Sequence, residues 1–364
     1  YLLSSGQVRS AESMVPDPQQ AYSEQAAVVV YVDAQNAGES AVGRTLAPFL
    51  KELPGQLANL PGAEELPMPS ASELSFLQSL EGVELAEIVL VMEGEAAQGG
   101  TSQMSENDSL LLVTKLTQVL EDQEGLIGQL LALAEQRQSG LSNQVAQTRS
   151  REGAAEMFAV PSEAFGDAQL PFPVSLALGP GTGGSVLAFG RTDKVKGFLS
   201  GQTTGRLPVT VDKLMSSRGQ VWIYASIPPE AAQAMGAGGA QGADQVPMMA
   251  GMSESLEQVR NFGMNFSLNS RGLDFQLALG FASSQAAQEM KQSVDGMVGF
   301  MKMAASQSPS SASGSLQRLQ VGSAGDVFRL STSVALSELR QGVQIARQQL
   351  GASGGMGATA GARP

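Results

Sequence analysis

The same order of predicted strands and helices occurs twice along this chain of 364 residues. Each half begins with a short apolar strand, "VVVYVDA" in the first and "VWIYASI" in the second, with Tyr31 and Tyr224 at matching places. A helix, strands that pair, a long helix, two more strands and a last helix follow in both halves. This repetition favours two tandem, similar α+β domains, each a mostly antiparallel sheet covered on one face by long helices. Coincidence is the alternative, because strand–helix–strand order is common.

The first half alternates short apolar runs with segments of helical spacing. Continuous Val-rich or Leu-rich runs predict strands, whereas apolar residues three or four positions apart predict helices. Ser40 is the predicted N-cap of the first helix. The predicted strands are 26–33, 83–93, 172–178 and 185–190, and the predicted helices are 40–60, 109–135 and 192–200.

The clearest local pattern lies in the second half. "NFGMNFSL" and "LDFQLALGF" alternate in the manner of strands around "NSRG", which predicts a hairpin over 260–281. A Ser/Ala/Gly-rich loop is predicted over 306–315. The other predicted strands are 219–227, 315–321 and 326–333, and the predicted helices are 229–257 with an interruption, 283–305 and 334–350.

The two ends of the chain are predicted to lie outside the folded domains. Residues 1–25 are a linker or tether, either the remainder of a signal peptide or anchor or an ordinary disordered segment. Domain 1 is predicted over 26–205 and its duplicate, domain 2, over 206–350. Residues 351–364 are a flexible Gly-rich tail. No apolar run of about 18 residues occurs, so no transmembrane helix is predicted.

The stretch "SLALGPGTGGSVLAFGRTDK", residues 175–194, raises the question of a phosphate-binding loop. Such a loop needs a Lys followed by Ser or Thr after its last Gly, and it leads directly into a helix. A dinucleotide-binding loop also opens a helix. Here Ser185 and Val186 follow Gly184, and the chain continues into an apolar run. The glycines therefore predict a hairpin turn between two strands.

The chain contains no His and no Cys. These absences exclude thiolate nucleophiles, Cys or His zinc sites, His-ligated haem and Ser-His-Asp triads, and no cofactor is predicted. Asp33, Glu64 and Glu65 do not have the spacing of a calcium loop, so we interpret them as solvated acids. The net charge of −13 repels phosphate backbones, and nucleic-acid binding is not expected.

Methionines are concentrated in the second half. Thioether side chains are soft and adaptable, so this cluster is a candidate surface for an apolar ligand or a partner helix. Core packing is the alternative, because Met290, Met297 and Met301 share helical spacing with Val294. A Cu(I) site built from thioethers is a third interpretation. The candidate residues are Met248, Met249, Met252, Met290, Met297 and Met301.

These observations favour a non-catalytic structural or interaction protein over an enzyme. We expect an exported or membrane-tethered bacterial subunit of a larger assembly, periplasmic or at the cell surface, with a cytoplasmic location as the alternative. Its partners are expected to be proteins, in a homo-oligomer or a multi-subunit complex, and membrane contact is expected only through a tether upstream of Tyr1.

Two other functions compete with this interpretation. The first is a carrier or chaperone for an apolar ligand, which predicts a cavity between Met297, Met301 and the sheet. The second is a carboxylate-dependent or metal-dependent hydrolase, which requires two acids about 5–10 Å apart in a cleft.

Overall fold

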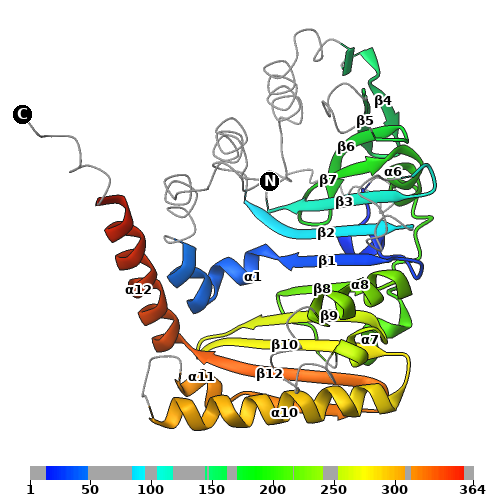
Figure 1. The fold of residues 1–364 in the computed structure, drawn as a ribbon. Helices are drawn as coiled ribbons and strands as arrows, with labels where there is room; N and C mark the ends of the chain where they lie inside the picture. Colours follow the sequence, from blue (N-terminus) through cyan, green and yellow to red (C-terminus); the bar gives the residue numbers. More distant parts are fainter. Residues whose placement is uncertain are drawn as a thin grey trace, which may run out of the picture.

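A computed structural model describes residues 14–47, 84–94, 105–117, 144–145, 147–161, 170–215, 217–240, 253–307 and 313–355. Its strands form one twelve-stranded antiparallel sheet in the order β11-β12-β10-β9-β8-β1-β2-β3-β7-β6-β5-β4 (Figure 1). The strands are β1 (Val28–Asp33), β2 (Leu85–Glu93), β3 (Ser109–Leu116), β4 (Ser150–Glu152), β5 (Ala155–Val160), β6 (Val174–Gly181), β7 (Gly184–Arg191), β8 (Val221–Ser226), β9 (Val259–Leu268), β10 (Gly272–Phe281), β11 (Gln320–Ala324) and β12 (Val327–Ala335).

Helices connect and flank these strands. Ser40 caps residues 41–47, as predicted, because its hydroxyl accepts the Gly43 N–H at 2.8 Å. The remaining elements are the 3₁₀ helix η2 (Pro18–Ala21) and the helices α1 (Ala34–Glu39), α6 (Thr192–Leu199), α7 (Val209–Leu214), α8 (Pro229–Ala240), α10 (Ser284–Gln307), α11 (Ser313–Gln317) and α12 (Leu336–Gly355).

The two halves of the chain meet at the centre of the sheet, where β1 pairs with β8. Val30 lies opposite Ile223, and Tyr31 lies opposite Trp222. Outward from β1 the order is β2-β3-β7-β6, and outward from β8 it is β9-β10-β12-β11. Strands of both predicted domains therefore belong to one continuous sheet, and the five innermost strands of each half follow the same order.

One face of the sheet, which we call face A, carries most of the core. Val29, Val89, Val113 and Trp222 are buried on it, and Val195 and Phe198 of α6 pack into the same cluster. The segment around Tyr22, with η2, covers β2 and β3, and helix α7 covers β9 and β10 on the same face. Burial of these apolar side chains is the main force that holds the first half together.

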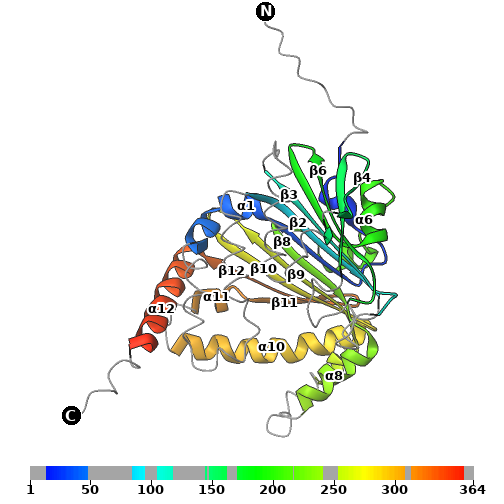
Figure 2. The same ribbon diagram turned by 90° about the horizontal axis from the view of Figure 1, so that it is seen from above.

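The opposite face, face B, is covered at one end by α10. Met290, Val294 and Val298 pack there with Phe281 and Phe328 in a second cluster. In Figure 2, α10 runs along the edge of the sheet that is formed by β11. The described helices thus lie on both faces of the sheet, whereas the sequence predicted that they would cover one.

The Gly/Pro stretch is a hairpin, as predicted. Gly181 pairs with Gly184 at the turn between β6 and β7, and Gly183 has a φ of 72°. A Cβ at Gly184 would lie 1.9 Å from the carbonyl oxygen of Leu116, so β3 approaches this end of the hairpin too closely for a side chain. The turn leads directly into β7, which agrees with the predicted hairpin and not with a phosphate-binding loop.

The predicted helix over 109–135 is wrong at its start, because Ser109–Leu116 form β3. This strand lies between β2 and β7 and buries side chains on both faces. Its apolar run therefore lacks the alternation of a half-exposed strand and also fits helical spacing. Residues 118–135 lie outside the described residues.

Several short elements were not predicted. β4, β5, α7 and α11 have no strong periodicity, and α11 occupies the end of the loop predicted over 306–315. α12 continues to Gly355, so the first five residues of the predicted flexible tail are helical. None of the helices in the described ranges is both long and apolar enough to cross a membrane.

Candidate binding groove

A row of side chains crosses face A from the centre of the sheet to its β11 edge. The strand register places Tyr31 opposite Trp222 and Trp222 opposite Asn265. The same row continues through Gln276, Ser331 and Gln320. We call Asn265, Gln276, Ser331 and Gln320 the polar row. Neighbouring side chains in such a row are about 5 Å apart, so the polar row presents one amide or hydroxyl on each of four strands.

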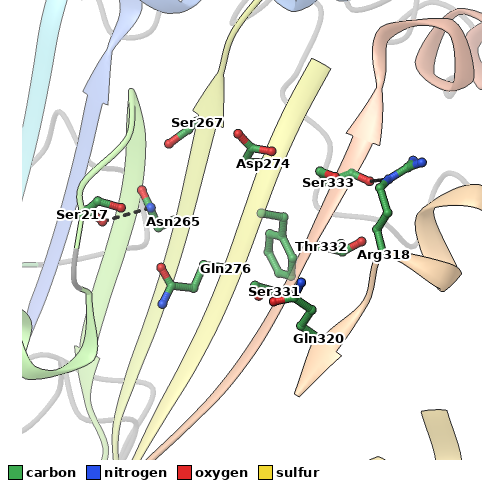
Figure 3. A pocket seen from close by; sticks show the side chains of 11 residues that line it. Ser217, Asn265, Ser267, Asp274, Gln276, Arg318, Gln320, Ser331, Thr332 and Ser333 are labelled. Carbon is green, nitrogen blue, oxygen red and sulfur yellow. Dashed lines mark hydrogen bonds between the residues drawn. The ribbon is translucent and has the colours of Figure 1, made fainter. Parts of the chain in front are cut away.

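A hollow of about 440 Å³, which we call the polar groove, opens over this row (Figure 3). Most of its walls and floor consist of hydroxyl and amide side chains, with one carboxylate and one guanidinium at the rim. The lining residues are Ser217, Asn265, Ser267, Asp274, Phe275, Gln276, Arg318, Gln320, Ser331, Thr332 and Ser333.

Asn265 fixes one wall of the groove. Its side-chain oxygen accepts the Gly219 N–H at 2.6 Å, and its NH₂ donates to the Ser217 carbonyl at 3.1 Å (Figure 3). The side chain is 95% buried, with both of its polar atoms in hydrogen bonds. Asn265 therefore holds the loop before β8 in place and has little capacity left for a ligand.

Arg318 fixes the opposite wall. Its Nε donates to the Ser333 carbonyl at 2.8 Å, and its guanidinium forms an ion pair with Glu338. The Glu338 carboxylate also accepts the Ala335 N–H at 2.9 Å at the start of α12. One carboxylate thus links the groove wall to the first turn of α12, which points away from the sheet (Figures 1 and 2).

The rest of the groove has unused hydrogen-bonding capacity. Gln320 is exposed, while Gln276, Ser331, Ser267 and Ser333 are half-buried. Across the described part of the chain, none of these five side chains takes part in a hydrogen bond. Polar groups in a sheltered hollow that satisfy no internal partner are available to a bound molecule.

A second hollow of about 360 Å³, which we call the aromatic hollow, adjoins the polar groove, and Ser267 lines both. Its three aromatic rings stand among polar and charged residues, and the lining consists of Tyr22, Tyr31, Trp222, Gln19, Asp33, Arg218, Gly219, Gln220 and Ser267. Tyr31 stacks on Trp222 in this hollow, with ring centroids 5.5 Å apart and an interplanar angle of 20°. Burial, with the Glu87 carboxylate nearby, raises the pKa of the Tyr31 phenol. Tyr31 therefore stays neutral near neutral pH, and its hydroxyl hydrogen-bonds the Glu87 carboxylate.

A third hollow, of about 420 Å³, lies in the first half against α6. The Glu93 carboxylate accepts from Lys194 and from the Ser109 hydroxyl at 3.1 Å. Burial alone would raise the pKa of Glu93, but the Lys194 ammonium and the hydroxyls of Ser23 and Ser109 together lower it. The pair therefore stays ionised and joins α6 to β2.

Comparison with known proteins identifies no family. No protein-family model matches the chain, and no curated protein matches its sequence. Among solved structures, crystal form III of TP0453 has a TM-score of 0.43 and 10% identity, covering 90% of this chain and 97% of that one. Crystal form I of TP0453 has a TM-score of 0.36 and 10% identity, covering 92% and 98%. TM-scores this low support no conclusion about a shared fold or function.

The predicted methionine surface is only partly placed. Met248, Met249 and Met252 lie outside the described residues. Met290 and Met301 pack into the cluster under α10, while Met297 is 38% exposed. None of the three hollows above is lined by a methionine, so the apolar cavity expected of a carrier gains no support there.

The predicted acids are also accounted for in part. Asp33 caps α1 by accepting the Asn36 N–H at 3.0 Å, while Glu64 and Glu65 lie outside the described residues. Within the described ranges, no three side chains of the types Asp, Glu, His or Cys gather as a metal site would require.

Sequence reasoning missed the polar groove. The signal was present in the hairpin, where Asn265 and Ser267 alternate with Met264 and Phe266, and Asp274 and Gln276 with Phe275 and Leu277. Alternation of this kind predicts a strand with one polar face. It does not tell an ordinary solvated face from a hollow, because the walls come from segments far away in the sequence.

Proposed function

We propose that this chain is a non-catalytic binding protein that holds a polar ligand or partner segment in the polar groove. The observation that carries the proposal is the set of unpartnered amide and hydroxyl side chains, led by Gln276 and Ser331, on the floor of a sheltered hollow. Such groups recognise a molecule by hydrogen bonds and supply no nucleophile activated by a base.

The chemistry of the groove supports binding without turnover. Asp274 is the one carboxylate among its described lining residues, and it accepts from the Asn269 side chain at 2.8 Å. Hydrolysis of a glycosidic bond usually requires two carboxyl groups that face one another. The Arg318 guanidinium is paired with Glu338 and with the Ser333 carbonyl, so its role is to form the wall of the groove.

We also infer that the chain arose by duplication of one α+β unit. In this duplication Val30 corresponds to Ile223. The strand register then places the polar row at positions equivalent to one row of the first half, which consists of Val91, Leu111, Gly190 and Ser175. The first half buries its row in the core with α6, whereas the second half keeps a hollow over its own. In this proposal, one copy became a core and the other a binding surface.

The cellular setting is proposed from the sequence. An acidic chain without Cys or His suits an exported or membrane-tethered bacterial subunit that works in a larger assembly with protein partners. We place the groove at the contact with the molecule that this subunit holds.

Filling the groove tests the proposed function. Ser331→Trp places a large ring on the groove floor, and Gln292→Trp places the same ring on the exposed side of α10 as a matched control. Each variant replaces the chain in its source cells, and native mass spectrometry measures the mass of the complex that contains it, with any bound ligand retained. We expect Ser331→Trp to lower that mass and Gln292→Trp to leave it unchanged. An unchanged mass for both variants, or turnover of a substrate by the purified chain, would contradict the proposal.

A further inference from the structure

We propose that the ligand of the polar groove is an extended oligosaccharide that lies across the strands, with one sugar unit in the aromatic hollow against Tyr31. This inference rests on the proposed function and names the chemical class of the ligand.

The first argument is the spacing of the row. Strands lie about 4.8 Å apart, so the polar row offers a hydrogen-bonding side chain at intervals close to the length of one hexose unit in an extended glycan. Gln276, Ser331 and Gln320 stand on three successive strands, and Tyr31 stands on the same row two strands beyond Asn265 on the other side. A chain of sugars can therefore keep one register with β10, β12 and β11, where Gln276, Ser331 and Gln320 are accessible.

The second argument is the chemistry of the groups. A sugar ring presents hydroxyls that both donate and accept, and amides and hydroxyls complement them in both directions. Gln276 and Gln320 each provide a donor pair and an acceptor, and Ser267, Ser331 and Ser333 each provide a hydroxyl. A ligand rich in hydroxyls can satisfy this set without a net charge.

The third argument is the aromatic end of the row. The apolar C–H face of a sugar ring packs on an aromatic ring, and Tyr brings a large rigid contact area with a polar tip. Tyr31 is backed by Trp222, which is only 2% exposed, so its ring is held in one orientation. Because Ser267 lines both hollows, a molecule in the polar groove can extend into the aromatic hollow.

Other macromolecules fit this surface less well. A peptide strand would bind through backbone hydrogen bonds at a sheet edge, with alternate side chains in apolar pockets, whereas this row lies on a sheet face. A nucleic acid would need a basic surface, and the chain carries a net charge of −13.

The single Trp supplies a direct readout. Trp222 is the only Trp in the sequence, it contacts Tyr31, and it lies opposite Asn265. The purified full chain is titrated with β-1,4-linked glucose and N-acetylglucosamine oligomers of two and six units, and with maltohexaose, while Trp fluorescence and heat of binding are recorded. We expect at least one hexasaccharide to bind, with an affinity about tenfold or more above that of its disaccharide.

Variants decide whether the row is responsible. Gln276→Ala should weaken binding about tenfold, since one hydrogen bond of a bound ligand is lost. Gln292→Ala, on the exposed side of α10, should leave the affinity unchanged. Tyr31→Phe should bind nearly as well as the parent chain because it keeps the ring on which the sugar packs, and Tyr31→Leu should bind more weakly than Tyr31→Phe.

The outcomes separate this inference from the proposed function. Binding of no oligosaccharide, or equal affinity for the two-unit and six-unit forms, overturns the saccharide assignment. If Ser331→Trp still lowers the native mass in that case, the groove binds another class of molecule and the proposed function stands. If the groove variants leave saccharide binding unchanged, the sugar binds elsewhere and the inference is overturned as well.

Discussion

Phe198 and Phe300 both lie on helices, but their surroundings differ completely. Phe198 of α6 is fully buried in the core of face A, whereas Phe300 of α10 is 69% exposed. The same side chain therefore contributes very differently to stability at the two sites. Deleting a buried aromatic ring removes its transfer free energy and leaves a cavity, and deleting an exposed ring does neither.

We accordingly expect Phe198→Ala to lower the free energy of unfolding by about 3–5 kcal/mol. Phe300→Ala is the matched control and should change it by less than about 0.5 kcal/mol. Urea denaturation followed by Trp222 fluorescence measures both. Similar losses for the two variants would mean that α6 does not seal the core.

Glu93 links stability to pH. Its folded-state pKa lies below the ordinary value of 4.5, so the unfolded chain binds its proton first as pH falls. The ion pair with Lys194 thus stabilises the fold above about pH 4.5, and this contribution is lost as pH falls through the lowered pKa. Glu93→Gln should make the difference in free energy of unfolding between pH 7 and pH 3 smaller.

Glu254→Gln, at an exposed acid, is the control for this measurement. Urea titrations of the parent and both variants at the two pH values provide the comparison. If Glu93→Gln shows the same pH dependence as the parent chain, the carboxylate does not gain its stability from Lys194.

At the scale of elements, the start of α10 shows how a single hydroxyl sets a boundary. The Ser283 hydroxyl accepts the Ala286 N–H at 3.2 Å and donates to the Gln258 side chain at 3.2 Å. The first contact satisfies a free N–H of the helix end, and the second ties the helix to the turn before β9. The N-terminus of α10 is thereby anchored where the helix begins to cover face B.

Ser283→Ala is expected to lower the free energy of unfolding by about 1 kcal/mol through loss of this cap. Ser284→Ala is the matched control, because Ser284 is exposed and lies one position further on. Thermal or urea unfolding of both variants supplies the test. Equal effects at the two positions would show that the cap is not what begins the helix.

The elements that could be predicted from the sequence are those with a strong local pattern of apolar residues. β1, β2, β8, the hairpin β9–β10 and α10 have dense apolar runs, strict alternation or a capped helical stripe. β3 was predicted as a helix because its apolar run fits the helical spacing as well as that of a buried strand. α7 and α11 are too short to show a helical period. The polar groove escaped because Ser217 and Arg318 reach its rim from segments that no local pattern connects.

At the scale of the whole molecule, the β1–β8 pairing makes two sequence halves into one sheet. Backbone hydrogen bonds run from Asp33 to Gln220 and from Ser226 to Ala27. Hydrogen-bonded and non-hydrogen-bonded pairs alternate along two antiparallel strands. Val30 and Ile223 lie three positions from each of these hydrogen-bonded pairs, so they form a non-hydrogen-bonded pair. The Cα atoms of such a pair are about 4.5 Å apart. This separation lies within the range of a disulfide.

The double variant Val30→Cys, Ile223→Cys should therefore form an intramolecular disulfide in a chain that has no other Cys. Faster migration without reductant and the loss of two hydrogen masses would detect it. The double variant Val30→Cys, Val221→Cys is the control, because Val221 pairs with Val32 and its diagonal separation from residue 30 is too large. Failure of the first pair to oxidise would contradict the central register.

The continuity of the sheet has a consequence for how the polar groove would bind the proposed ligand. β9, β10 and β12 form the floor, and they are joined through β8 and β1 to the buried core of the first half. Continuous strand pairing joins the floor to that core, so we expect the floor to keep its shape before a ligand binds. A pre-organised surface loses little entropy on association, and its affinity is determined mainly by how slowly the bound molecule departs. Changes to the floor should thus alter residence time far more than arrival rate.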